Sequence, residues 1–208
     1  KTYRDCGVLP RLTIIEEKPT GAAFIYVNET SGENAIIVYP GAAEAIDISY
    51  VEDSRDVIEA ASVFVTQLEQ PADAACRALS IARHAGVATV FNPAPANYFP
   101  DDMFALSDFI VPNETEAEAI VGFPVDNLEA VERAGQVLRE KGAGTALITL
   151  GERGVYVCSG TVNMLVPAMT NAPVVDTSGA GDAFIGGFSA ALAEGFEVVE
   201  ATRFGCAT

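Results

Sequence analysis

A run of small residues ahead of an amphipathic helix is the segment whose residue types best suit chemistry. It reads Asp176-Thr177-Ser178-Gly179-Ala180-Gly181-Asp182, and the pattern after it predicts a helix over 183–194. Small residues let backbone N–H groups approach a ligand closely, and the unpaired N–H groups of a helix N-terminus carry about half a positive charge. Because phosphoryl transfer depends on positioning and charge stabilisation, this segment is suited to hold the anionic group that is transferred.

Asp182 would lie in the first turn of that helix, where its carboxylate could accept a proton from an attacking hydroxyl. A carboxylate is a weak base at neutral pH, but position matters more than base strength in a loose phosphoryl-transfer transition state. The alternative is an ordinary helix start, with a glycine-rich turn and an acidic residue that the helix dipole favours. The run contains neither the GxxxxGK(S/T) phosphate loop nor a GxGxxG motif opening directly from a strand, and by itself it leaves both interpretations open.

Polar residues also follow four short apolar runs, which cover 63–68, 87–91, 109–111 and 146–150. Longer amphipathic stretches separate these runs, and that alternation indicates a parallel sheet with helices on both faces. The polar clusters occupy 67–69, 92–95, 113–116 and 149–151. Ligands bind at the carboxyl ends of parallel strands, so four such clusters in succession favour a functional rim over ordinary polar turns.

The first 40 residues have a different pattern from the rest. Short β-prone runs cover 11–17, 22–28 and 34–39, and a turn over 29–33 predicts a hairpin from the last two. Later in the chain, residues with helical spacing form apolar faces: Val131, Ala134 and Leu138 in one stretch, and Phe184, Phe188, Ala191 and Leu192 in another. The sequence therefore predicts an α/β fold, with part of a small β-lid and its connections in 1–40. A doubly wound, mostly parallel sheet with helices on both faces is expected in 41–208.

Composition excludes several classes of function. A formal net charge of −17 argues against non-specific nucleic-acid binding, and the apolar runs are too short to span a membrane. His84 is the only histidine and lies on an otherwise ordinary helical stretch, so it offers little for a Ser-His-Asp triad or a His-rich metal site. The four cysteines (Cys6, Cys76, Cys158 and Cys206) are widely spaced, and we expect them to be reduced and buried. Without a secretory signal, a cytoplasmic protein is expected.

The motifs, taken together, resemble the ribokinase-like (PfkB) carbohydrate kinase family. DTSGAGDAFIGGF is similar to the signature near the C-terminus of its members, and PTGAAFIYVNETSGENAIIV, QLEQP, NPAPA, VPNETEAE and ITLGERGV precede it in the family's order and spacing. The resemblance covers nearly all of the 208 residues. It implies a ribokinase-like fold and an ATP-dependent kinase that phosphorylates a hydroxyl of a small sugar, with D-ribose converted to ribose 5-phosphate as the expected reaction.

The resemblance also implies roles for single residues. Asp182 matches the catalytic base, which contacts the sugar, and the anion hole is matched by Gly179, Ala180 and Gly181. The positions that bind ATP are matched by Asn113, Thr149, Gly151 and Gly154. Glu116 matches a residue that acts on Mg²⁺ through water, and a monovalent-cation site, expected to take potassium, is matched by Asp176 and Ser178. The sugar contacts are matched by Glu69 and by the lid residues Ala23 and Ile25.

Simpler structural interpretations of these residues stay open at this point. Glu116 could be a solvated acid at a helix start, and Glu69 an exposed turn residue. Ala23 and Ile25 share one strand face, as core residues do, and Asp176 could cap the turn before the anion hole.

The same comparison of motifs leaves alternatives for the whole chain. Nothing here matches the family's N-terminal sugar-binding Asp and GGKGAN stretch, and Thr208 falls within the helix where members begin to close the adenine pocket. We therefore expect a chain truncated at both ends. It could belong to a kinase for another sugar, such as fructose or 2-keto-3-deoxygluconate, or be a non-catalytic fragment that binds nucleotide or a partner. Members often dimerise through the lid, so a homodimer through the predicted hairpin is expected.

Overall fold

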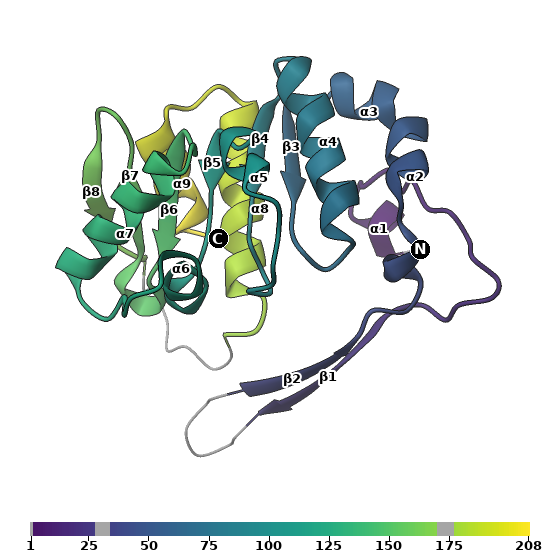
Figure 1. Ribbon diagram of the computed structural model, residues 1–208, viewed down its shortest axis with the longest axis horizontal. Helices are drawn as coiled ribbons and strands as arrows, with labels where there is room; N and C mark the ends of the chain where they lie inside the picture. Colours follow the sequence, from purple (N-terminus) through teal and green to yellow (C-terminus); the bar gives the residue numbers. More distant parts are fainter. Residues whose placement is uncertain (1, 28–33, 170–176) are drawn as a thin grey trace.

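The computed structural model describes residues 2–27, 34–169 and 177–208, and a six-stranded sheet lies at its centre (Figure 1). The strands lie in chain order across the sheet: β3 (Val63–Thr66), β4 (Ala88–Phe91), β5 (Phe109–Ile110), β6 (Thr145–Thr149), β7 (Val155–Cys158) and β8 (Asn163–Val166). Strands β3 to β6 are parallel to one another, whereas β7 and β8 are antiparallel additions at one edge. The parallel half therefore presents the carboxyl ends of four strands at a single edge.

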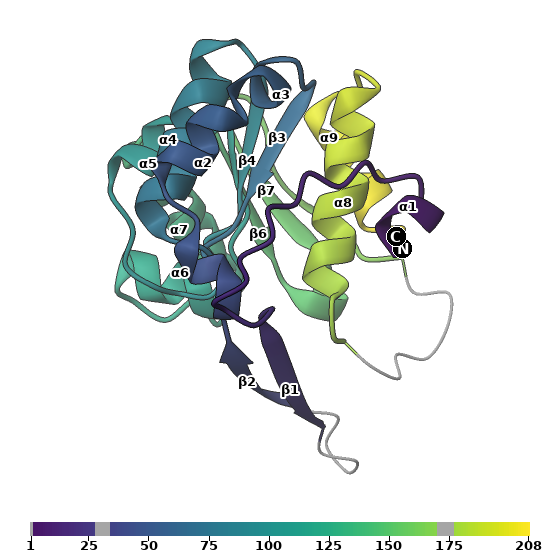
Figure 2. The ribbon, with the colours of Figure 1, turned by 90° about the vertical axis from the view of Figure 1, so that its right-hand side faces the viewer.

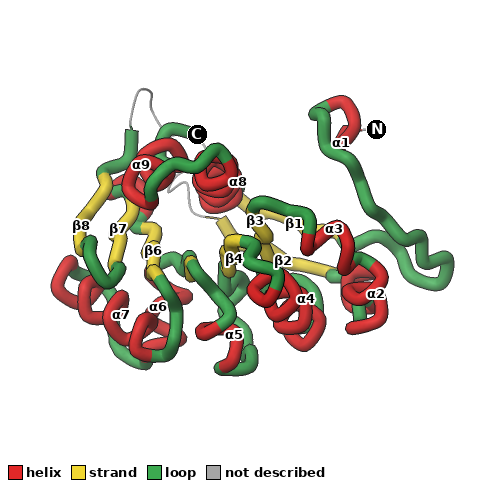
Figure 3. The backbone as a smooth tube through the Cα atoms, turned by 90° about the horizontal axis from the view of Figure 1, so that it is seen from above, coloured by secondary structure: helices red, strands yellow, loops and turns green. Residues whose placement is uncertain are grey.

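Helices cover both faces of this sheet (Figure 3). One face carries α4 (Ala72–His84), α5 (Asp102–Ala105), α6 (Glu114–Val121) and α7 (Leu128–Glu140), and the other carries α8 (Ala180–Ala193) and α9 (Val198–Gly205). The remaining elements are α1 (Thr2–Asp5), η1 (Gly41–Ala45), α2 (Ile48–Asp53), α3 (Arg55–Glu59) and η2 (Gly151–Arg153). The predicted α/β class, with a mostly parallel sheet between two helical layers, is confirmed.

Successive side chains along the strands pack into two separate hydrophobic cores, one on each face of the sheet. Phe91 and Ile148 pack with the helices of the α4–α7 layer, whereas their neighbours Val90 and Leu147 pack with α8 and α9. Successive strand residues point to opposite faces, so a sheet covered on both sides requires apolar residues at nearly every position. The predicted apolar faces of the two helices are confirmed as well. Leu192 is partly buried, and the other predicted face residues are all buried: Val131, Ala134, Leu138, Phe184, Phe188 and Ala191.

The predicted hairpin is formed by β1 (Ala22–Val27) and β2 (Asn34–Tyr39), which pair antiparallel. Asn28 and the predicted turn over 29–33 lie outside the described residues. The hairpin projects from the body beyond the edge at which α8 begins (Figure 1). Its side chains are exposed on both faces: Phe24 is 69% exposed and Ile25 is 51% exposed.

One expectation about secondary structure was wrong and another was incomplete. Residues 11–17 form no strand, and this segment is irregular and exposed apart from the half-buried Ile15. Its β-prone composition has no effect there because it pairs with none of the described strands, and a strand needs a partner for its hydrogen bonds. Conversely, β7 and β8 were not anticipated; they are joined by a tight turn in which the N–H of Val162 donates to Ser159 Oγ.

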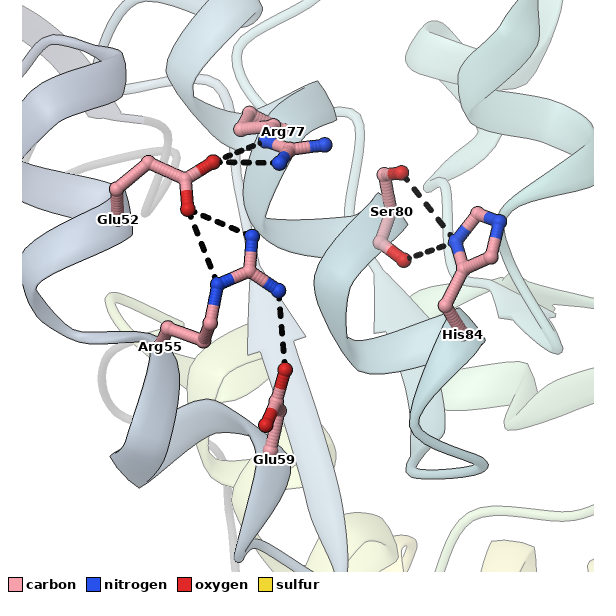
Figure 4. A network of polar contacts seen from close by, with 6 residues as sticks. All are labelled: Glu52, Arg55, Glu59, Arg77, Ser80 and His84. Carbon is pink, nitrogen blue, oxygen red and sulfur yellow. Dashed lines mark hydrogen bonds and ion pairs between the residues drawn. The ribbon is translucent and has the colours of Figure 1, made fainter.

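An ionic network holds α2 and α3 against α4 (Figure 4). Arg55 and Arg77 both donate to the Glu52 carboxylate, at 2.6 Å in each case, and Arg55 also reaches Glu59 at 3.0 Å. The hydrogen bonds from the two guanidinium groups lower the pKa of Glu52 below its ordinary value. Beside this network, the Nδ1 of His84 lies 2.6 Å from the backbone oxygen of Ser80, within α4. The hydroxyl of Ser80 lies 3.5 Å from the same nitrogen, so His84 contacts a residue one helical turn away, as expected for an ordinary surface helix residue.

The cysteines differ from the expectation in one respect. All four thiols are free, as expected, but only Cys158 is buried: Cys76 and Cys206 are half-buried, and Cys6 is exposed. Cys6 directly follows the short α1, which buries no residue, so nothing in that segment covers the thiol. Within the described parts of the chain, no helix combines the length and apolar character needed to cross a membrane.

Candidate active site

The four predicted polar clusters meet at one edge of the sheet, as predicted for the ends of parallel strands. Backbone bonds carry the strand pairing into the clusters: the N–H of Asn92 donates to Thr66 O at 2.9 Å, and the N–H of Thr149 donates to Pro112 O at 2.9 Å. Asn113 and Thr149 form a further parallel bridge. These bonds make the rim a continuation of the sheet, which is a rigid base for a binding site.

The start of α8 lies at the same end of the sheet (Figure 2). Gly179 caps the helix with φ of 78°, and the regular pairing of the helix begins where the N–H of Ala183 donates to Gly179 O at 2.9 Å. The N–H of Ala180 already donates to Thr177 O at 3.1 Å, whereas the N–H groups of Gly181 and Asp182 precede the first i−4 bond. A Cβ added at Gly179 or Gly181 would meet nothing within 4 Å, so both face open space. This arrangement can receive an anion.

Asp182 is exposed and lies within hydrogen-bonding distance of the rim. The Nε2 of Gln67, directly after β3, donates to Asp182 Oδ1 at 2.9 Å and to Asn92 Oδ1 at 3.3 Å. Gln67 and Asn92 were expected in the rim, but their connection to Asp182 was not. Gln67 and Asp182 stand 115 positions apart in the chain, so no local pattern could have indicated the contact.

Asn113 and Glu116 form a capping box at the start of α6. Asn113 Oδ1 accepts from the N–H of Glu116 at 2.8 Å, and Glu116 Oε2 accepts from the N–H of Asn113 at 2.8 Å. Glu116 is therefore an acid at a helix start, as one interpretation expected. It is not solvated as that interpretation assumed, because the residue is only 7% exposed. Burial raises the pKa of Glu116, and the bond from the Asn113 backbone opposes that rise only in part.

The segment after β6 contains two glycines with different surroundings. Gly151 has φ of 55° and open space beside it, whereas Gly154 has φ of 100° and is buried. A Cβ at Gly154 would lie 2.1 Å from Val166 O. Gly154 is thus required for the close approach of two backbones, and an ion pair between Arg153 and Glu114 ties this turn to α6.

The expected sugar-contact residues lie on exposed segments. Glu69 is exposed in the loop between β3 and α4. Ala23 and Ile25 lie on one face of the hairpin, opposite Val38 and Ile36, and both are exposed. The interpretation of these two residues as core residues is therefore wrong.

The expected cation ligands are described only in part. Asp176 lies outside the described residues, and Ser178 is exposed in the turn before Gly179. Over 2–27, 34–169 and 177–208, no group of three or more His, Cys, Asp or Glu side chains could hold a metal ion. Mg²⁺ does not require such a group, because it is commonly bound by one or two carboxylates together with substrate phosphates. Glu116, beside the Asn113 amide at the rim, fits that pattern.

Comparison with known proteins gives a consistent result. The family described as "pfkB family carbohydrate kinase" matches residues 1–208. The chain is 37% identical over 194 residues to a ribokinase of Haemophilus influenzae, covering 93% of this chain and 63% of that protein. It is 41% identical over 176 residues to a ribokinase of Staphylococcus aureus, covering 85% of this chain and 57% of that protein.

A solved structure of similar fold comes from Arabidopsis thaliana, a ribokinase complexed with ribose and ATP. It superposes with a TM-score of 0.83 at 28% identity, covering 91% of this chain and 61% of that one. The chain therefore spans about three fifths of the length of these relatives.

Proposed function

Because the chain belongs to the pfkB family of carbohydrate kinases, we propose that it carries the phosphoryl-transfer site of an ATP-dependent sugar kinase whose substrate is D-ribose. The identity to two bacterial ribokinases supports ribose over fructose or 2-keto-3-deoxygluconate. One observation carries the proposal: a carboxylate, Asp182, lies in the first turn of α8 beside amides that precede the first helical bond, at the edge where four parallel strands end. This observation also favours a catalytic chain over a fragment that only binds nucleotide or a partner.

In the proposed reaction, the 5-hydroxyl oxygen of the sugar attacks the γ-phosphorus of ATP. The bond from that phosphorus to the oxygen of ADP breaks, and the hydroxyl proton passes to Asp182. The start of α8 at Gly179, Ala180 and Gly181 receives the transferred group. The N–H of Ala180 is bonded to Thr177 O in the structure, so this amide would have to exchange partners to contact the phosphoryl group. Charge on the transferred group is stabilised by fixed amide dipoles, which need no reorganisation during the reaction.

The remaining roles follow the positions around this centre. ATP contacts are assigned to Asn113, Thr149, Gly151 and Gly154, along the edge that continues from α8 across β5 and β6. Glu69 and the hairpin residues Ala23 and Ile25 are assigned to the sugar. Glu116 would hold Mg²⁺ through water, and the ion would supply positive charge to the phosphates.

An assay of the full-length protein with ATP, Mg²⁺ and a panel of sugars tests the proposal. We expect ADP release with D-ribose to exceed that with fructose or 2-keto-3-deoxygluconate by at least about tenfold, because one well-formed set of hydroxyl contacts discriminates strongly. A larger rate with either of the other sugars would assign the protein to that substrate. The absence of release with every sugar would contradict the kinase proposal.

Potassium activation belongs to the same proposal, supported by the match of Asp176 and Ser178 to a cation site. We expect the rate of the ribose assay to be higher in potassium chloride than in lithium chloride at matched ionic strength. Equal rates in the two salts would contradict activation by potassium. Free thiols on all four cysteines and the use of ATP favour the cytoplasm, which fractionation would test.

A homodimer through the hairpin is supported by its two apolar faces. Ile25 and Ile36 pair on one face, and Phe24 and Ile37 pair on the other, all at least 51% exposed. One face can cover the sugar while the other packs on a second copy, so that neither stays exposed. Light scattering of the full-length protein should give the mass of a dimer, and the mass of a monomer would contradict the proposed homodimer.

Glu116→Gln tests the assignment of Mg²⁺. We expect the Mg²⁺ concentration for half-maximal rate to rise about tenfold or more, as for other residues that orient a metal's ligands. Folding should not suffer, because glutamine keeps an oxygen for the N–H of Asn113. Burial raises the pKa of Glu116 in the folded protein above its value in the unfolded chain. The stability that the protonated Glu116 contributes is therefore fully present below the unfolded-state pKa, and it is lost as the pH rises through the folded-state pKa.

At neutral pH the neutral glutamine avoids that loss, and the melting temperature without Mg²⁺ should therefore stay level or rise. Glu129→Gln is the matched control, since Glu129 is an exposed acid in the first turn of α7. An unchanged Mg²⁺ requirement in Glu116→Gln would exclude Glu116 from the metal site.

A further inference from the structure

Three side chains form a continuous chain of hydrogen bonds from the sheet to Asp182. The Nδ2 of Asn92 donates to Val111 O at 2.6 Å, and the Nε2 of Gln67 donates both to Asn92 Oδ1 at 3.3 Å and to Asp182 Oδ1 at 2.9 Å. Asn92 is buried and Gln67 is half-buried, whereas Asp182 is exposed. The chain thus connects an exposed carboxylate on α8 to the fixed backbone that follows β5, across the sheet that α8 covers (Figure 3).

The direction of every bond in this chain follows from its first member. A backbone carbonyl can only accept, so the NH₂ group of Asn92 must face Val111 O. The Oδ1 of Asn92 must then face Gln67, which therefore presents its NH₂ group rather than its oxygen. Both N–H bonds of that group are used, one on Asn92 and one on Asp182. Asp182 Oδ1 is consequently held as an acceptor.

Gln67 is itself held in place by its own loop. The Nε2 of Gln70 donates to Gln67 O at 2.8 Å and to Thr66 Oγ1 at 2.8 Å. Gln67 therefore engages one oxygen of Asp182, Oδ1, and a base held in this way would take a proton on its other oxygen, Oδ2.

We propose that Gln67 is a positioning residue for phosphoryl transfer: it binds Asp182 Oδ1 and thereby turns Oδ2 toward the hydroxyl that attacks ATP. This inference rests on the proposed kinase function, in which Asp182 is the base. An exposed side chain in the first turn of a helix has several rotamers, and restricting it to one keeps the reacting atoms in the orientation that transfer requires.

Two substitutions in the full-length protein separate positioning from packing. Gln67→Leu removes both donors, and we expect kcat to fall at least about tenfold, up to the roughly hundredfold that a displacement of about 1 Å can cost in an active site. KM for ATP and for ribose should change by less than about twofold, because Gln67 is proposed to contact neither substrate and the binding of both should be unchanged. Gln67→Glu keeps the shape of the side chain but turns an acceptor toward two oxygens, so its loss should be at least as large. A residue needed only for packing would tolerate that isosteric change.

A double-mutant cycle supplies a second readout. In the Asp182→Asn background, Gln67→Leu should lower kcat by less than about twofold further, because residues that act as a unit are not additive. Gln136→Leu, an identical substitution at an exposed position of α7, should retain the parent rate and melting temperature. Melting curves of all variants show whether each is folded, and if Gln67→Leu does not fold, Gln67→Glu and its double mutant carry the test.

Each result has a definite consequence. Near-parental kcat in Gln67→Glu, or full additivity with Asp182→Asn, would overturn the positioning role while the kinase proposal stands. A parent protein without activity on any sugar would overturn the kinase proposal, and this inference with it. Loss of kcat in both Gln67 variants, without a loss in the Gln136 control and without additivity, supports the inference.

Discussion

Asp182→Asn in the full-length protein should lower kcat by at least about a hundredfold, since general-base groups contribute about 10²–10⁴. Asparagine has the same shape but cannot take the proton of the attacking hydroxyl. Its oxygen can still accept from Gln67, which would turn the new NH₂ group toward the sugar. The amides at the start of α8 are unchanged, so ATP affinity should stay nearly intact. Steady-state rates and a calorimetric Kd for ATP measure the two effects separately.

Asp53→Asn is the control for this variant, because Asp53 is an exposed acid in the last turn of α2. It should behave as the parent protein in both measurements. Turnover close to normal in Asp182→Asn would remove Asp182 from the proposed mechanism. A large loss of ATP affinity would instead mean that the carboxylate helps to hold the nucleotide.

Gly154→Ala should destabilise the protein by on the order of 3 kcal/mol or more, from a strained backbone (about 1–3 kcal/mol) and an overpacked contact (about 1–3 kcal/mol). Gly154 has φ of 100° and ψ of −140°, a region that residues with a Cβ avoid. The new methyl would also lie 2.1 Å from Val166 O and 2.6 Å from the N of Ala168, both backbone atoms that cannot rotate away. A domain is stable by only about 5–15 kcal/mol, so the loss should be obvious in chemical denaturation.

Gly151→Ala provides the matched comparison three residues earlier. Gly151 also has positive φ, 55°, but a Cβ there meets nothing within 4 Å. Its cost should be limited to the left-handed conformation, about 1–2 kcal/mol. Equal destabilisation by the two substitutions would mean that the contact with Val166 is not what requires glycine at 154. Since the N–H of Leu150 donates to Gly154 O at 2.8 Å, Gly154→Ala should also weaken ATP binding by moving the turn.

Most of the secondary structure and the rim could be predicted from the sequence. The apolar runs at 63–68, 87–91, 109–111 and 146–150 correspond to β3, β4, β5 and β6, with ends shifted by one or two residues. These runs are informative because strands that are buried on both faces need apolar residues at almost every position. The meeting of their polar ends then follows from the parallel direction alone, as the bonds from Asn92 and Thr149 bear out.

Local patterns were misleading where long-range pairing decided the outcome. Residues 11–17 are as β-prone as many strands but pair with no described strand, whereas the short β7 and β8 are strands because β6 and the turn at Ser159 give them partners. Strand formation depends on neighbours in space, and composition reports only the tendency to accept them.

The environment of the candidate site belongs to the tertiary structure. The sequence by itself determined that Glu116 lies in the first turn of a helix and that Asp182 follows a run of small residues, because capping and backbone freedom act between near neighbours. Only the packing of α6 against the sheet buries Glu116 and raises its pKa. Only the position of α8 across β3 and β4 brings Asp182 to Gln67, since residues 115 positions apart meet through the contacts of whole elements.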